Sequence, residues 1–147
     1  MTTATHAPLL VLLVGVPGSG KSTFASDLCS AAAAVTEWSR ISQDALGTRK
    51  RCIRAAEAAL LKGHPVIIDR CNFDPEQRAH WLQLPSIKGA PHGTCAAVFL
   101  DTPMDVAYER VLARPAHEGG VDSTKMSAQK MRSIVRVSRA GTGTVDT

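Results

Sequence analysis

Eight consecutive residues near the start of the chain have the types and spacing of a phosphate-binding loop. They follow an apolar run at 9–14, precede a helix-like stretch at 23–34, and read Gly15-Val16-Pro17-Gly18-Ser19-Gly20-Lys21-Ser22. In such a loop, backbone N–H groups surround a phosphate chain at a helix N-terminus, where partial positive charge favours an anion. The pattern G-x-x-x-x-G-K-[ST] between a strand and a helix therefore predicts a site for ATP and Mg²⁺.

Each residue type in this loop has a physical task. Glycine lets the backbone curl and approach the phosphates closely, which a Cβ would obstruct. Lys21 is expected to reach the β- and γ-phosphates, and the Ser22 hydroxyl is expected to bind Mg²⁺. The residues expected to contact ATP are Gly15, Pro17, Gly18, Ser19, Gly20, Lys21, Ser22 and Thr23. The alternative is a structural Gly-rich turn, but the full pattern and both flanks favour phosphate binding.

Two carboxylates follow expected strands and are candidates for chemistry. Asp69 comes directly after the apolar run 66–68, the usual context of a second acid associated with Mg²⁺. Asp44 follows the expected strand 37–42, where a carboxylate can accept a proton from an attacking hydroxyl. The alternative role for each is to cap a helix N-terminus. We favour chemistry for Asp44.

The positions of these residues follow from an alternation of strands and helices. Apolar runs predict strands at 9–14, 65–69 and 95–100, and alternating polarity predicts another at 37–42. Helices are expected at 22–34, 48–62, from Asp74 as N-cap to about 84, 101–113 and 123–137. The alternation predicts an α/β fold of the P-loop kinase type, a small parallel sheet with helices on both faces. The carboxyl ends of its strands would then carry the site.

Length and composition indicate one domain. The chain has 147 residues, of which 44% are hydrophobic, so we expect a single domain over 1–147 with loosely held ends at 1–8 and 140–147. The expected helix at 101–113 should face inward through Met104, Ala107, Tyr108 and Val111. The tail after 137 shows no fifth apolar run, which favours a minimal or C-terminally truncated domain. Nothing in the sequence indicates an oligomeric state.

Charge and cysteine usage narrow the class of protein. Seventeen basic residues against thirteen acidic ones give a net charge of +4, with basic clusters at 49–54 and 125–139. Such clusters either bind nucleic-acid phosphates or form solvated helix faces. The four cysteines and five histidines are scattered, which argues against a zinc site. Without a signal peptide or a membrane-spanning run, we expect an intracellular protein, nuclear or cytoplasmic, that does not bind a membrane.

Four segments together resemble the polynucleotide 5'-hydroxyl kinase family. They read G-V-P-G-S-G-K-S-T-F at 15–24, I-S-Q-D-A-L-G at 41–47, K-R-C at 50–52 and V-I-I-D-R-C-N-F-D-P-E-Q-R at 66–78. The similarity is to the kinase domain of bifunctional polynucleotide kinase/3'-phosphatases and to the kinase-like domain of plant aprataxin-like proteins. It extends over about 9–112.

The resemblance implies roles for several residues. Asp44 matches the general base for the 5'-hydroxyl, and Arg51 matches a basic residue that faces the acceptor. Asp69 and Asn72 match the second acidic motif beside the phosphates. The family also has an arginine-bearing lid over the nucleotide, for which the best candidates here are Arg110, as a nucleotide ligand, and Arg114, as a catalytic residue.

Three functions are compatible with these residues. The leading hypothesis is ATP-dependent phosphorylation of the 5'-hydroxyl of DNA or RNA in end repair. The second is a small-molecule or nucleoside kinase on the same scaffold, since the phosphate loop does not identify the acceptor. The third is a non-catalytic nucleotide-binding module of a repair protein. The basic cluster at 49–54 modestly favours a polyanionic acceptor.

Overall fold

The computed structural model describes residues 9–91 and 93–113. Strands and helices alternate along this part of the chain, as the sequence predicts. The elements are β1 (Leu10–Val14), α1 (Lys21–Ala32), β2 (Ser39–Ser42), α2 (Gln43–Leu46), α3 (Arg49–Leu61), β3 (Val66–Asp69), α4 (Pro75–Leu82), β4 (Cys95–Phe99) and α5 (Met104–Ala113). None of the helices in this described part is long and apolar enough to cross a membrane.

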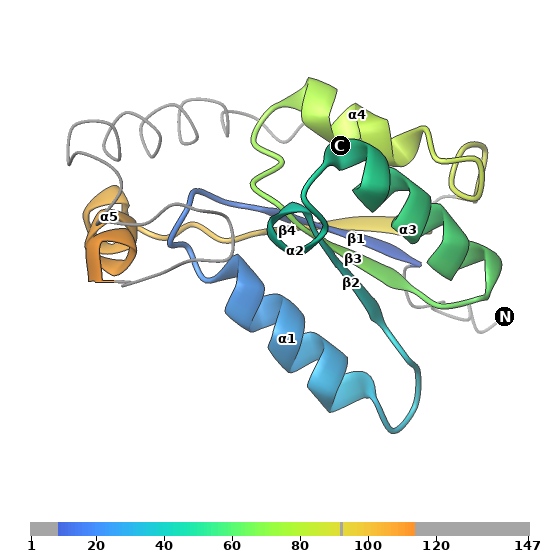
Figure 1. Cartoon of the computed structure of the whole chain (residues 1–147), viewed down its shortest axis with the longest axis horizontal. Helices are drawn as coiled ribbons and strands as arrows, with labels where there is room; N and C mark the ends of the chain where they lie inside the picture. The colour runs from blue at the N-terminus through green and yellow to red at the C-terminus, as the bar shows by residue number, and fades with distance from the viewer. Residues whose placement is uncertain (1–8, 92, 114–147) are drawn as a thin grey trace, which may run out of the picture.

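The strands form one parallel sheet in the order β2-β3-β1-β4 (Figure 1). Leu10 at the start of β1 pairs with Val66 of β3 on one side and with Cys95 of β4 on the other. Because all strands run in the same direction, their carboxyl ends meet at one edge of the sheet. Ser42 and Asp69, the last residues of β2 and β3, are partners there. This edge carries the loops that the sequence predicts to form the site.

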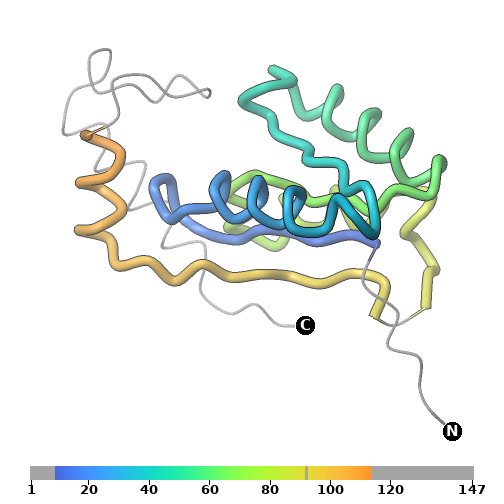
Figure 2. Tube along the Cα trace, turned by 90° about the horizontal axis from the view of Figure 1, so that it is seen from below, coloured from blue at the N-terminus to red at the C-terminus, as the bar shows by residue number. Residues whose placement is uncertain are grey.

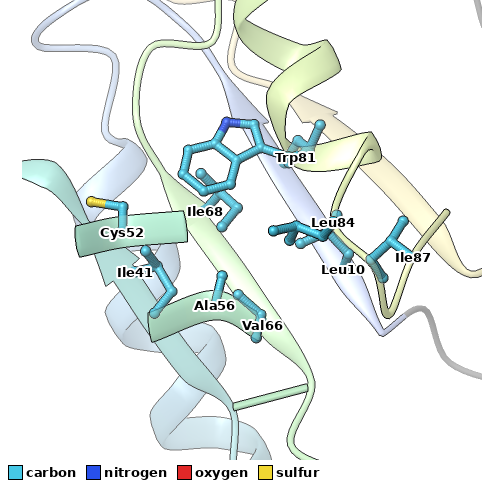
Figure 3. Close-up of a cluster of buried hydrophobic side chains, with 10 residues drawn as sticks. Leu10, Ile41, Cys52, Ala56, Val66, Ile68, Trp81, Leu84 and Ile87 are labelled. Carbon is cyan, nitrogen blue, oxygen red and sulfur yellow. The ribbon is translucent and has the colours of Figure 1, made fainter. Parts of the chain in front are cut away.

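One face of the sheet packs against α3, α4 and the segment after α4 (Figure 3). Alternate residues of the strands meet small and aromatic residues of the helices there, since successive strand side chains point to opposite faces. Trp81 of α4 is fully buried in this cluster, whereas its neighbour Leu82 is 43% exposed. The buried members are Leu10, Leu12, Ile41, Cys52, Ala56, Val66, Ile68, Trp81, Leu84 and Ile87.

The other face packs against α1. Val11, Leu13 and Ile67 point to this side and contact Ala25 of α1. The prediction of helices on both faces is therefore confirmed. In Figure 2 the β4 segment runs along the side of the molecule opposite α3 and leads into α5.

Local signals set the ends of two helices. Thr48 is the N-cap of α3, and its side chain accepts a hydrogen bond from Arg51 N. Asp74 caps α4 by accepting a 2.7 Å bond from Gln77 N, with Pro75 in the first turn. These capping bonds satisfy backbone donors that have no partner inside the helix. The predicted N-cap at Asp74 is confirmed.

The expected inward face of α5 is partly wrong. Ala107 and Val111 are buried, but Met104 is 36% exposed and Tyr108 is only partly buried. The reason is that α5 contacts the phosphate loop rather than the sheet, since Ala107 clusters with Val16. Two small residues four positions apart, Ala107 and Val111, are enough for this contact with the loop. The helix expected at 123–137 and the tail lie outside the described residues.

Candidate active site

The phosphate loop runs from the carboxyl end of β1 to the first residue of α1. Gly20 is the N-cap of α1, with φ +98° and no side chain to cap the helix. The positive end of a 12-residue helix therefore lies directly after the loop without a capping side chain. The structure brings all eight residues expected to contact ATP into this loop and the first turn of α1.

Lys21 is folded back over the loop. Its ammonium donates to Val16 O (2.8 Å), Gly15 O (3.0 Å) and Ser19 Oγ (3.4 Å), and the residue is only 8% exposed. A buried ammonium costs free energy unless it is hydrogen-bonded, and the loop supplies the partners. These bonds hold the positive charge at the centre of the loop, where a phosphate would need it.

Two glycines of the loop are required by close contacts. A Cβ on Gly15 would lie 2.5 Å from Ser19 Oγ and 3.3 Å from Leu100 O. A Cβ on Gly18 would overlap Ala107 O of α5, and Gly18 has φ +81°, which L side chains rarely adopt. The glycine at position 18 therefore also allows the loop to pack directly against α5.

The segment after β4 supports the loop from the side. Thr102 Oγ1 donates to Ser19 O (2.9 Å), and Arg110 Nη1 donates to Gly18 O (3.2 Å). Arg110, expected as a nucleotide ligand, thus lies beside the loop. Sequence reasoning missed the role of Thr102, because a hydroxyl just before a helix gives no sign that it reaches a loop 83 residues away.

Asp69 is held by an ion pair with a neighbouring strand. Arg40 of β2 donates through Nε (2.9 Å) and Nη2 (2.6 Å), both to Asp69 Oδ2. The Asp69 side chain is 4% exposed and that of Arg40 26%. Sequence reasoning did not identify Arg40. It lies two residues before the end of β2, at a position where a solvent-facing charge is unremarkable.

The oxygen donors at this edge fit Mg²⁺. Mg²⁺ prefers hard oxygen ligands and is usually held by one or two protein groups together with phosphates and water. The Ser22 hydroxyl at the start of α1 and Asp69 Oδ1, which is not the oxygen bound by Arg40, are groups of this kind.

Asp44 lies at the same edge as the phosphate loop. It is exposed in the first turn of α2. The chain after β3 is joined to the loop, since Cys71 O accepts a hydrogen bond from Gly15 N (3.2 Å). Burial raises the pKa of the Cys71 thiol, the charge of Lys21 lowers it, and the charge of Asp44 raises it.

The capping alternative for Asp44 is wrong. Ser42 occupies the N-cap position of α2, and Asp44 lies inside the helix. Close by, Arg51 lies exposed in the first turn of α3, and its Nη1 lies 3.5 Å from Leu46 O. The structure therefore brings Asp44 and Arg51 to adjacent short segments at the open edge. Arg114 lies outside the described residues.

Asn72 holds neighbouring segments together through hydrogen bonds. It is fully buried with φ +46°, and its Nδ2 donates to Leu13 O (2.9 Å) and Arg70 O (3.2 Å). Its Oδ1 accepts from Trp81 Nε1 (3.0 Å), and its carbonyl accepts from Arg78 Nη1 (3.0 Å). The resemblance implies that Asn72 acts beside the phosphates. Its side chain points into the protein instead, where it joins β1 to α4.

Comparisons with known proteins agree with this arrangement. The chain is 39% identical over 127 residues to a protein named Transcription factor bHLH140 from Arabidopsis thaliana, covering 82% of this chain and 13% of that protein. It is 42% identical over 76 residues to the Bifunctional polynucleotide phosphatase/kinase of Schizosaccharomyces pombe, covering 51% of this chain and 17% of that protein. The chain thus spans a small part of the length of each.

Solved structures share the fold. Kti12 of Chaetomium thermophilum in complex with ADP-AlF3 superposes with a TM-score of 0.57 at 20% identity, covering 88% of this chain and 79% of that one. A gluconokinase from Sinorhizobium meliloti 1021 gives 0.51 at 21% identity and covers 90% of both chains. A family model described as an AAA domain matches residues 10–56 and 47–137. The chain therefore belongs to this AAA domain family and has a P-loop kinase fold, in agreement with its resemblance to the polynucleotide 5'-hydroxyl kinases.

Proposed function

We propose that this domain transfers the γ-phosphate of ATP to the 5'-hydroxyl of a nucleic acid. The observation that carries the proposal is the position of Asp44. It lies in the first turn of α2, directly after β2 at the edge of the sheet that holds the phosphate loop, and α2 contacts α3, whose first turn is basic. The name of the Schizosaccharomyces pombe relative supports the same acceptor.

The proposed reaction uses Asp44 as general base. Its carboxylate takes the proton of the 5'-hydroxyl while the oxygen attacks the γ-phosphorus, and the bond to the β–γ bridging oxygen breaks to release ADP. Lys21 and Arg110 offer positive charge to the phosphates from the two sides of the loop. Bound Mg²⁺, held through Ser22 and Asp69, would neutralise phosphate charge.

The acceptor is proposed to lie along the first turns of α3. Four basic residues are exposed there, and the turn adjoins α2 with its carboxylate. Phosphate contacts of this kind position a nucleic acid without reading its sequence. The four are Arg49, Lys50, Arg51 and Arg54.

The test is γ-phosphate transfer from labelled ATP to a 5'-hydroxyl oligonucleotide by the Asp44→Asn variant. Loss of the base should lower kcat by about 10²- to 10⁴-fold, with ATP affinity close to wild type. Asp27→Asn, which removes an exposed carboxylate from the middle of α1, is the matched control and should behave as wild type. Near-normal transfer by Asp44→Asn would refute the assignment of the base.

Salt dependence separates the acceptor classes. A polynucleotide releases counterions when basic residues bind its phosphates, so its KM should rise steeply with salt. A neutral sugar or nucleoside acceptor would show a flat dependence. Transfer to a small neutral substrate with that flat profile would favour the second hypothesis, and ATP binding without transfer to any acceptor would favour the non-catalytic module.

A further inference from the structure

Two buried polar atoms of the described residues have no hydrogen-bond partner. They are Gln43 Oε1 and Arg70 Nη1. Buried polar groups are almost always hydrogen-bonded, because an unpaired one loses its bonds to water without replacement. Each exception therefore needs an explanation, and a ligand that supplies the missing partner is one.

The two residues are neighbours in the fold. The strands β2 and β3 are paired up to Ser42 and Asp69, so Gln43 and Arg70 are the next residues along each strand path. Parallel strands lie about 5 Å apart, which places the two backbones side by side at the carboxyl edge. One orphan is an acceptor and the other a donor, and both come from residues that adjoin members of the proposed site.

The surroundings of Arg70 favour an anionic ligand. Its guanidinium carbon lies 6.0 Å from the centroid of the Trp81 ring, which fixes one face of the group. Arg70 is only partly exposed, and its Nη1 is buried. A half-buried guanidinium gains most from a partner that carries negative charge and accepts hydrogen bonds.

We propose that Arg70, through its orphan donor Nη1, binds the phosphate that joins the reacting nucleoside to the rest of the acceptor strand. A phosphodiester accepts hydrogen bonds but donates none, so it supplies a partner for Arg70 Nη1 and not for Gln43 Oε1. This subsite rests on the proposed function, because Asp44, the group that would touch the 5'-oxygen, follows directly after Gln43, and Gln43 and Arg70 come after the paired residues Ser42 and Asp69. The linkage adjacent to the reacting nucleoside is the acceptor phosphate nearest to that oxygen. The arginine thus selects an acceptor that carries this phosphate.

The first experiment compares kinetics of wild type, Arg70→Gln, Arg70→Lys and Lys62→Gln with a 5'-hydroxyl oligonucleotide. A charged hydrogen bond lost to the phosphate should raise KM about 10- to 100-fold in Arg70→Gln, with kcat much less changed. Arg70→Lys keeps the charge but not the planar fork, so it should recover part of the loss. Lys62 is an exposed residue at the far end of α3, and its variant controls for loss of one charge.

The second experiment removes the charge from the acceptor instead. An oligonucleotide with one neutral methylphosphonate at the linkage next to the 5'-hydroxyl nucleoside is compared with one modified at a distant linkage. For wild type, the oligonucleotide modified next to the 5'-hydroxyl nucleoside should have a higher KM than the one modified at a distant linkage. The factor should be about the one by which Arg70→Gln raises KM for the unmodified oligonucleotide. Arg70→Gln itself should show no further loss, since the two changes remove the same contact.

The outcomes separate the two proposals. If wild type transfers no phosphate to any 5'-hydroxyl oligonucleotide, the proposed function fails. The Arg70 subsite is refuted, while the proposed function stands, if wild type transfers phosphate but Arg70→Gln has the KM of wild type. It is also refuted if the rises in KM caused by Arg70→Gln and by the methylphosphonate multiply when both are present. A purely structural arginine would lower the melting temperature without a selective effect of the first linkage.

Discussion

The two halves of the candidate site are built differently. The donor side, residues 15–22 with their supports at 102–110, is held by its own side chains, since Lys21 binds loop carbonyls and Thr102 and Arg110 bind the loop backbone. The acceptor side, residues 43–51 and 70–72, leaves charged side chains exposed and holds both orphan atoms of the described residues. The donor side therefore keeps its shape through the chain's own contacts, whereas on our proposal the acceptor side is completed by the strand that binds to it.

Among changes on the donor side, replacing Lys21 should have the largest effect on activity, and it should act on that side alone. Lys21→Ala removes the ammonium from the centre of the loop, and loss of one group that stabilises transition-state charge costs about 10²–10³ in kcat. Transfer from labelled ATP, with ATP binding followed separately, measures the effect. Lys62→Ala, at an exposed position on α3, is the control. Rapid transfer by Lys21→Ala would mean that the loop does not hold the γ-phosphate.

Replacing Asn72 should cause the largest loss of stability, because it joins the two sides. In Asn72→Ala, Trp81 Nε1 and Leu13 O lose their partner, at about 1–3 kcal/mol for each buried group left unpaired. Urea unfolding measures the change in the free energy of unfolding. Asn72→Gly loses the same bonds but tolerates φ +46° without strain, so it should be less destabilised than Asn72→Ala. If both variants were as stable as wild type, the hydrogen bonds of Asn72 would not contribute to the stability of the fold.

The two sides also differ in what the sequence predicts. The phosphate loop is a local pattern of eight residues between a strand and a helix, so its position and glycine spacing can be predicted. Asp44 and Asp69 follow from the rule that loops after parallel strands meet at one edge. The bonds from Arg40 to Asp69 and from Trp81 to Asn72 depend on strand order and on which helix face is buried. Those contacts are tertiary, and single-residue patterns carry no trace of them.

Replacing Arg40 tests whether Asp69 belongs to the donor side. Arg40→Gln leaves a nearly buried carboxylate without its cation, which should destabilise the fold by about 1.5–3 kcal/mol. The freed carboxylate should also lower the Mg²⁺ concentration needed for nucleotide binding, measured by titrating Mg²⁺ at fixed ATP. Lys62→Gln, at an exposed position at the far end of α3, serves as control. An unchanged Mg²⁺ midpoint would argue that Asp69 only pairs with Arg40.

Two glycines with the same φ separate the effect of backbone strain from that of close packing on the donor side, and Gly63→Ala should have the smallest effect on activity. Gly18 and Gly63 both have φ +81°, but a Cβ at Gly18 would overlap Ala107 O, whereas a Cβ at Gly63 meets nothing within 4 Å. Alanine in this backbone region costs about 1–3 kcal/mol at either position. Gly63→Ala should therefore lose that amount of stability and keep wild-type ATP affinity. Gly18→Ala must also push α5 from the phosphate loop, so it should be less stable than Gly63→Ala and bind ATP more weakly. Equal losses in the two variants, measured by urea unfolding and ATP titration, would show that α5 does not support the loop.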